Sequence, residues 1–144
     1  MIKAASVQFN HRPNDKDYNL QQIDNFCKQA AKDGVDILAF PEMCITGYWH
    51  VRNLSRDQVE ALSENIESGP SVKRIKRLAK EYNLLIGTGL IEKAPNGELY
   101  NSYVVALPDG RIHCHRKLHC FISEHMSSGS EYTVFDTHLG VKVG

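Results

Sequence analysis

The sequence predicts a layered α/β domain in which helices pack against a sheet. Two segments with apolar residues at helical spacing alternate with short apolar runs, and three strand-like runs separated by glycine-containing turns follow them. A strand–helix–strand–helix order that leads into consecutive strands is typical of helices covering one sheet. With 144 residues, 42% of them hydrophobic, the chain is large enough for one buried core. We therefore expect a single domain over residues 1–144.

The first part of the chain contains a strand, a helix and a second strand. Residues 2–9 alternate like a strand, and Asn14 lies in a turn-forming segment where it is expected to cap the next helix. The apolar face of this helix comprises Leu20, Ile23, Phe26, Cys27, Ala30 and Ala31. Gly34 stands at the position of a C-terminal helix cap, and residues 35–40 form the short apolar run of a strand buried on both faces.

The middle of the chain contains a polar excursion and a second helix. Residues 43–65 are mostly polar with a weak helical pattern, and we expect them to form an excursion at an edge of the sheet. Residues 68–71, Ser-Gly-Pro-Ser, predict a helix start because proline favours the first helical turn. The apolar stripe of that helix comprises Val72, Ile75, Leu78, Ala79 and Tyr82.

The last part of the chain is dominated by strands. Three of them are expected at residues 84–92, 100–107 and 111–115. Turn residues at 95–98 and 108–110 predict hairpins and therefore an antiparallel meander. Residues 132–136 and 139–144 have the pattern of two further strands, and the second stops as its alternation begins. Natural proteins usually protect an apolar strand edge with charged residues or proline, so we expect this domain to be C-terminally incomplete.

Charge and hydropathy exclude several classes of partner. The 17 Lys and Arg residues equal the 17 Asp and Glu residues, so no net field attracts nucleic acid or an anionic membrane. The longest apolar runs are far shorter than the roughly 20 residues that cross a bilayer. The N-terminal segment lacks the features of a signal peptide, so we expect a cytoplasmic protein. Its four cysteines are then expected to be reduced thiols.

Two charged residues follow directly after predicted strands. Glu42 comes after the apolar run 35–40, where low-dielectric surroundings can adapt a carboxylate to general base catalysis. Lys117 comes after the strand 111–115, where a buried ammonium can stabilise an oxyanion. Taken singly, Glu42 fits an ordinary solvated carboxylate at a strand end better than a catalytic base. A lone lysine in a basic loop likewise usually faces solvent.

Considered together, these segments resemble the nitrilase superfamily of carbon–nitrogen hydrolases. The resemblance is carried by Ala5-Ser6-Val7-Gln8, Leu38-Ala39-Phe40-Pro41-Glu42-Met43, Thr46-Gly47-Tyr48, Gly87-Thr88-Gly89, Tyr100-Asn101-Ser102 and Arg116-Lys117-Leu118-His119. These pieces have the order and spacing of the family and cover nearly the whole chain. The resemblance implies an αββα sandwich of the nitrilase type, present here as its N-terminal half. It further implies an enzyme without metal or organic cofactor that forms a homodimer or a higher homo-oligomer when complete.

The resemblance also assigns roles to individual residues. In the family a glutamate, a lysine and a cysteine form the catalytic set, and the first two correspond to Glu42 and Lys117. Glu124 corresponds to a further glutamate that orients the lysine and the substrate, although its surroundings depart from the common pattern, and a plain loop carboxylate remains an alternative. Tyr48 is expected to line the substrate pocket, although simple packing explains an aromatic residue there equally well. The implied reaction is hydrolysis of a non-peptide carbon–nitrogen bond in a small amide, carbamoyl or nitrile compound.

The nucleophilic cysteine of the family is not expected among these 144 residues. It lies further beyond the lysine than this chain extends, so the chain as given is expected to be inactive. Cys44 is two residues from Glu42 without the sharp elbow that exposes a nucleophile, and Cys27 lies on the apolar face of a helix. Cys114 and Cys120 flank the lysine and stay open as alternatives from the sequence, although neither has a strand-turn-helix setting.

Two alternatives to this function remain open from the sequence. Residues 113–125 contain potential zinc ligands, namely His113, Cys114, His115, His119, Cys120 and His125. Their spacing matches no familiar zinc finger. Alternate residues of a strand such as His113 and His115 share a face, whereas Cys114 points to the opposite one. The second alternative is a naturally short, inactive homologue that acts as a binding partner.

Overall fold

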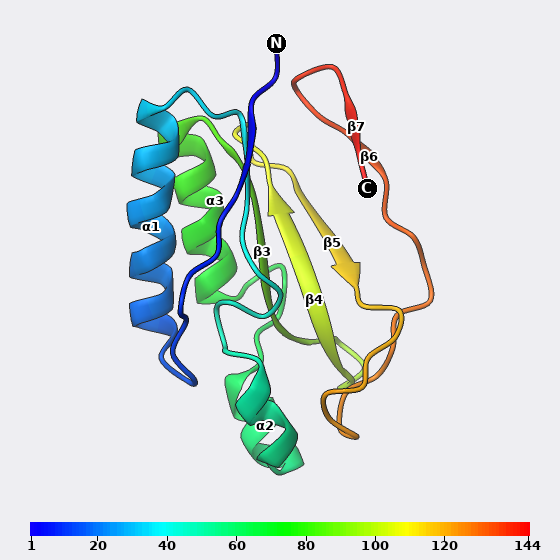
Figure 1. The fold of residues 1–144 in the computed structure, drawn as a ribbon. Coiled ribbons are helices and arrows are strands. Elements are labelled where there is room, and N and C mark those ends of the chain that lie inside the picture. Colours follow the sequence, from blue (N-terminus) through cyan, green and yellow to red (C-terminus); the bar gives the residue numbers. More distant parts are fainter.

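The structure, a computed structural model, describes residues 1–144 and confirms the α/β fold class (Figure 1). In chain order its elements are β1 (Ala4–Ser6), α1 (Lys16–Lys32), β2 (Ile37–Ala39), the 3-10 helix η1 (Trp49–Asn53), α2 (Arg56–Leu62), α3 (Pro70–Tyr82), β3 (Leu85–Lys93), β4 (Leu99–Ala106), β5 (Ile112–Arg116), β6 (Phe135–Asp136) and β7 (Lys142–Val143). Strands β1 to β5 form one sheet in that order, and β6 pairs with β7. The first three strands run parallel, and β3 to β5 form an antiparallel meander, as predicted.

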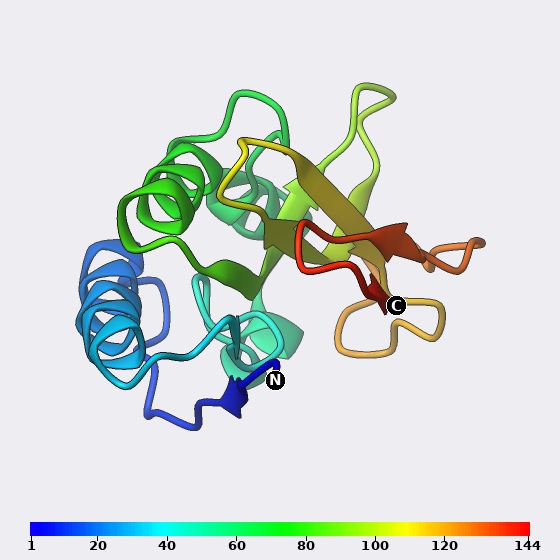
Figure 2. The same cartoon turned by 90° about the horizontal axis from the view of Figure 1, so that it is seen from above.

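The helices α1 and α3 lie side by side on one face of the five-stranded sheet (Figures 1 and 2). The buried cluster between these helices and the sheet includes Leu20, Ile23, Cys27, Leu38, Ile75, Leu78, Ile86 and Val104. Burying one such large apolar side chain is worth roughly 1.5–3 kcal/mol. Both predicted apolar stripes are therefore confirmed as the faces that attach the helices to the sheet. None of the helices combines the length and apolar character that a membrane span requires.

The start of α1 differs from the prediction by one residue. Asp15, not Asn14, is the N-cap, because its side chain accepts a hydrogen bond from the backbone nitrogen of Tyr18 at 3.0 Å. Asn14 adopts a positive φ of 59°, and its Oδ1 atom lies 2.6 Å from Nε2 of His50. Asparagine tolerates this left-handed conformation better than most residues, so it forms the turn while aspartate caps the helix. Gly34 ends α1 with φ 67°, as predicted.

The predicted excursion follows β3 beyond the end of β2. The backbone nitrogen of Ile45 donates to the carbonyl of Gly89 at 3.1 Å, and that of Glu64 donates to Ile91 at 3.0 Å. Residues between these two contacts form η1 and α2. The excursion thus covers the part of the β3 edge that the three-residue β2 leaves unpaired. The first strand is likewise shorter than expected, because β1 has only the short β2 as partner.

The C-terminal hairpin covers part of the opposite face of the sheet. Side chains alternate along a strand, so Leu85 and Val105 point away from the helices. Phe135 of β6 and Val143 of β7 pack in the same cluster as these two residues. Two C-terminal strands are present as predicted, although residues 132–134 lie outside any strand. The face that holds this hairpin is also the face on which the candidate site is built.

Candidate active site

Glu42 is placed by a tight turn directly after β2. Beyond Pro41 the chain turns sharply, and Met43 adopts a left-handed conformation with φ 49°. The turn crosses β3 at Gly89, where an added Cβ atom would lie only 2.1 Å from the backbone nitrogen of Met43. Only glycine allows this approach, so Gly89 lets Glu42 lie directly against the sheet.

Lys117 lies one residue beyond β5 and reaches the same place. Its backbone nitrogen donates to the carbonyl oxygen of Asn101 at 2.8 Å, which extends the pairing of β4 and β5 by one residue. Its Nζ donates to Oε1 of Glu42 at 2.7 Å, so two residues 75 positions apart in the chain form an ion pair. The side chains of Lys117 and Glu42 are 30% and 42% exposed, so a small molecule can reach both.

The ion pair keeps the lysine charged. Partial burial lowers the pKa of Lys117, but the hydrogen bond and the negative charge of Glu42 raise it more, so the pKa of the ammonium lies above its usual value. At neutral pH the ammonium of Lys117 therefore lies in direct contact with the carboxyl group of Glu42. A carboxylate can accept a proton, and an ammonium can stabilise negative charge that develops on a substrate oxygen.

A small cavity of about 220 Å³ opens beside this pair. It is lined by Glu42, Asn101, Tyr103, His115 and Lys117. The hydroxyl of Tyr103 donates to the carbonyl of Phe40 at 2.8 Å, and burial raises the pKa of Tyr103 to about 12. This phenol is held by its hydrogen bond and is un-ionised at neutral pH.

Two aromatic rings lie near the ammonium of Lys117. The Nζ atom of Lys117 lies 5.9 Å from the ring centroid of Tyr48 and 5.3 Å from that of Phe121. Both distances allow cation–π attraction. Burial and the nearby charge of Glu42 raise the pKa of the Tyr48 hydroxyl. Tyr48 does not line the 220 Å³ cavity. Its expected place beside the substrate stays a prediction.

Glu124 lies in the loop that follows Lys117. Its side chain is exposed and forms neither a hydrogen bond nor an ion pair. The loop is anchored instead by Ile122 and Met126, which are buried in the cluster under α2. The structure therefore does not bring Glu124 to the ion pair, and its orienting role stays a prediction.

The four cysteines are all free thiols. Burial raises the pKa of Cys27 and of Cys44 to about 12 each, and burial together with the charge of Glu92 raises the pKa of Cys114 to about 11. Burial also raises the pKa of Cys120. A nucleophilic cysteine reacts as its thiolate, which a lowered pKa favours. None of these four thiols has a lowered pKa.

The potential zinc ligands of residues 113–125 are not gathered around one point. The ring of His113 stacks on Phe135 at a centroid distance of 3.9 Å. Cys114 points to the opposite face of β5, where its Sγ lies 3.8 Å from Oε2 of Glu92. No group of three His, Cys, Asp or Glu side chains is arranged to hold a metal ion. The geometry that a zinc module requires is therefore missing from this cluster.

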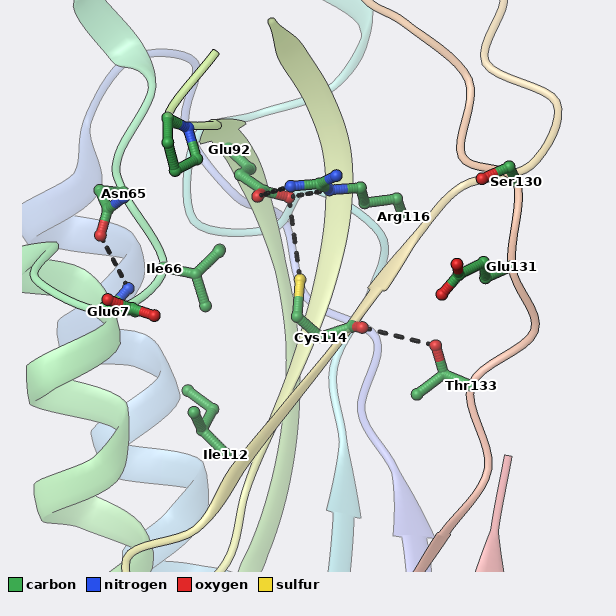
Figure 3. Close-up of a pocket in the computed structure, with 11 residues that line it drawn as sticks. Asn65, Ile66, Glu67, Glu92, Ile112, Cys114, Arg116, Ser130, Glu131 and Thr133 are labelled. Carbon is green, nitrogen blue, oxygen red and sulfur yellow. Dashed lines mark hydrogen bonds and ion pairs between the residues drawn. The ribbon is translucent and has the colours of Figure 1, made fainter. Parts of the chain in front are cut away.

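A second cavity of about 490 Å³ lies on the helix side of β5 (Figure 3). Its lining includes the buried Glu92, which accepts hydrogen bonds from Nη2 of Arg116 at 2.6 Å, from Nε of Arg116 at 2.9 Å and from Ser102 at 2.6 Å. Burial opposes ionisation of Glu92, but these hydrogen bonds outweigh it and lower the pKa of the carboxyl. Because its charges are already paired within the chain, we regard this network as structural.

Comparison with known proteins identifies the family of this chain. The family model described as carbon-nitrogen hydrolase matches residues 3–144. The chain belongs to the carbon-nitrogen hydrolase family. A nitrilase of Pyrococcus abyssi is 33% identical over 125 residues, which cover 86% of this chain and 46% of the relative. The omega-amidase NIT2 of Xenopus tropicalis is 31% identical over 148 residues, which cover 94% of this chain and 51% of the relative. This carbon-nitrogen hydrolase chain thus spans about half the length of the curated relatives it matches.

Solved structures confirm the nitrilase type of fold. Nit3 of Saccharomyces cerevisiae, a member of branch 10 of the nitrilase superfamily, superimposes with a TM-score of 0.82 at 29% identity, over 98% of this chain and 53% of Nit3. An N-terminal amidase in complex with an Asn-Glu peptide gives a TM-score of 0.79 at 22% identity, over 93% of this chain and 33% of that protein. The second similarity concerns the fold alone.

Three residues of the site were not recognised from the sequence of this carbon-nitrogen hydrolase chain. Asn101, Tyr103 and His115 line the cavity, but the sequence assigned none of them a catalytic or substrate-binding role and indicated His115 only as a potential zinc ligand. A signal for Asn101 was present, because a polar residue in the middle of an apolar strand needs a buried partner. The predicted hairpin also pairs Asn101 with the residue after the end of β5, which is Lys117.

Proposed function

We propose that the protein containing this chain hydrolyses a carbon–nitrogen bond of a small amide, carbamoyl or nitrile compound. The observation that carries the proposal is the contact of 2.7 Å between Glu42 and Lys117 beside a cavity. A base and an oxyanion-stabilising cation in contact are the two aids that acyl transfer needs besides a nucleophile. The names of the relatives, nitrilase and omega-amidase, support nitriles and amides as substrates.

The proposed reaction uses a cysteine thiol outside these 144 residues as the nucleophile. Glu42 takes the thiol proton, and the thiolate attacks the carbon of the scissile group while Lys117 stabilises the negative charge that develops on its oxygen or, in a nitrile, on its nitrogen. In an amide or carbamoyl compound the carbon–nitrogen bond then breaks, and the proton held by Glu42 leaves with ammonia or an amine. A nitrile first gives a thioimidate, whose nitrogen takes the proton held by Glu42, and one water adds to it before ammonia leaves and the thioester forms. Water then attacks the thioester, Glu42 takes a proton from that water, and the acid and the free thiol are released. No metal or organic cofactor takes part in this scheme.

The raised pKa values of the four thiols support a nucleophile from elsewhere, since none of the four is prepared to ionise near neutral pH. The roles of Tyr48 as a wall of the substrate pocket and of Glu124 as an orienting carboxylate complete the proposed site. A cytoplasmic location and a homo-oligomeric state of the complete protein are further parts of this proposal.

Ammonia release by the complete protein tests the proposal. Butyramide, N-carbamoylglycine and butyronitrile represent the three substrate classes. Glu42→Gln is expected to abolish turnover, because the amide keeps the shape of the side chain but cannot accept a proton. Lys117→Ala is expected to lower kcat at least about a hundredfold, as the loss of one oxyanion donor does.

Two exposed residues of α3 provide matched controls. Glu81→Gln and Lys73→Ala remove the same charges at a distance from the site and should leave kcat unchanged. Thermal unfolding must show that all four variants are folded. Wild-type turnover by Glu42→Gln, or no ammonia from any of the three substrates, would contradict the proposed function.

A further inference from the structure

Asn101 connects the two charged residues of the candidate site. It lies on β4 and is only 4% exposed. Its side-chain Nδ2 donates to Oε1 of Glu42 at 2.5 Å. Its backbone carbonyl accepts the hydrogen bond from the backbone nitrogen of Lys117 at 2.8 Å. One buried residue thus contacts both members of the pair, one with its side chain and the other with its main chain.

We propose that Asn101 is a positioning residue that holds the Glu42 carboxylate in the orientation required of a general base, an inference that rests on the proposed function. Oε1 of Glu42 accepts two hydrogen bonds, from Asn101 and from Lys117, whereas Oε2 accepts none. The two donors therefore fix the plane of the carboxylate. They leave the second oxygen free to take a proton.

The chemistry of the amide suits this task. An asparagine NH₂ group only donates hydrogen bonds, so it favours the ionised carboxylate over the protonated one. Unlike a second lysine or a histidine, it carries no charge and cannot exchange a proton with Glu42. The other amino acid of the same shape, aspartate, would place a like charge against Glu42.

The surroundings give Asn101 the rigidity that positioning requires. Strand β4 pairs with β3 on one side and with β5 on the other, so its backbone is fixed by two ladders. Glu42, in contrast, lies in a turn and its side chain is 42% exposed. The rigid strand therefore orients the carboxylate, and a catalytic group held in one orientation reacts faster than one that samples several.

The test compares Asn101→Leu and Asn101→Asp with wild type in the complete protein. Asn25→Asp, on the exposed face of α1, adds the same charge away from the site and is the control. Loss of a hydrogen bond to a charged group predicts a kcat about ten- to a hundredfold lower for Asn101→Leu. In Asn101→Asp the acid limb of the profile of kcat/KM against pH should move to higher pH by about one unit, because a like charge disfavours the carboxylate. A residue that only stabilised the fold would not move this limb.

A second measurement does not depend on activity. Protein labelled with ¹³C at its glutamate carboxyl groups reports the titration of Glu42, whose signal is identified by its absence from Glu42→Gln. The midpoint should rise in both Asn101 variants and stay unchanged in Asn25→Asp. Unchanged midpoints in folded Asn101 variants would overturn the inference. The proposed function fails separately, if Glu42→Gln turns over like wild type.

Wild-type protein provides the decisive measurement if both Asn101 variants fail to fold. The side-chain NH₂ signals of Asn101 should follow the titration of Glu42 in ¹⁵N spectra, because the two groups are hydrogen bonded. This pH dependence should disappear in Glu42→Gln. Side-chain NH₂ signals of Asn101 that do not shift when Glu42 is protonated would also overturn the inference.

Discussion

Gly89→Ala should displace Glu42 from its position while leaving its carboxylate unchanged. The added Cβ would lie 2.1 Å from the backbone nitrogen of Met43, whereas real Cβ atoms essentially never come within 3.0 Å of such a neighbour. The turn that carries Glu42 must therefore retreat by about 1 Å. The colliding atoms belong to the backbone, so no side-chain rotation can relieve the contact.

The displacement has two expected consequences of different size. Overpacking of this kind costs typically about 1–3 kcal/mol in the free energy of unfolding. A misplacement of about 1 Å at a catalytic group can lower the rate about a hundredfold. Gly89→Ala is thus expected to lose far more activity than its loss of stability explains, provided the assay temperature stays well below the melting point.

The assay combines urea unfolding with ammonia release by the complete protein. Gly110→Ala is the matched control, because its Cβ meets no atom within 4 Å while its φ of 92° strains an alanine. That strain should cost about 1 kcal/mol and leave kcat unchanged. A Gly89→Ala protein with wild-type kcat would refute the claim that this glycine sets the position of Glu42.

Three further predictions concern stability and the thiols. The lowered pKa of Glu92 means that its contribution to stability is present above the pKa of the unfolded state and is lost as pH falls through the folded pKa. Urea unfolding should therefore show Glu92→Gln less stable by about 2 kcal/mol at pH 7, which is less than for a fully buried pair because Arg116 is 39% exposed. The difference should shrink as pH falls through the lowered pKa of Glu92. Asp15→Ala should lower the free energy of unfolding by about 1 kcal/mol, because it removes the N-cap of α1. If Asn14→Ala lowered it by this amount and Asp15→Ala did not, Asn14 would be the N-cap. The 144-residue chain alone should release no ammonia from the three substrates, and a release that Cys120→Ala abolished would contradict the proposed origin of the nucleophile.

Local spacing in the sequence was sufficient to predict most of the elements. The apolar stripes of α1 and α3 were recognised because a helix buries every third or fourth residue, and Gly34 and Pro70 marked helix ends through their own backbone preferences. Glycines at 97 and 110 adopt the positive φ values that hairpin turns require. These signals depend on neighbours within a few residues, so helices and turns can be predicted from them without knowledge of the fold.

The limits of several elements depended on partners far away in the chain. Residues 2–9 have strand character throughout, but β1 is only three residues long because β2 offers three partners. Asn14 and Asp15 both suit a helix cap, and the choice between them follows from the contact of Asn14 with His50. Spacing alone could not decide either point, since both depend on residues more than thirty positions away.

For the candidate site, the sequence by itself determined which family motifs were present and that Glu42 and Lys117 each follow a strand. The contact between them, the turn over Gly89 and the hydrogen bond from Asn101 were decided by the tertiary structure alone. Glu124 is exposed, and the role in orienting Lys117 that the resemblance implies for it stays a prediction. The physical reason is that the site is formed where the turn after β2 crosses β3 and reaches side chains of β4 and of the residue after β5. The distances between these segments are set by sheet packing and not by the order of residues.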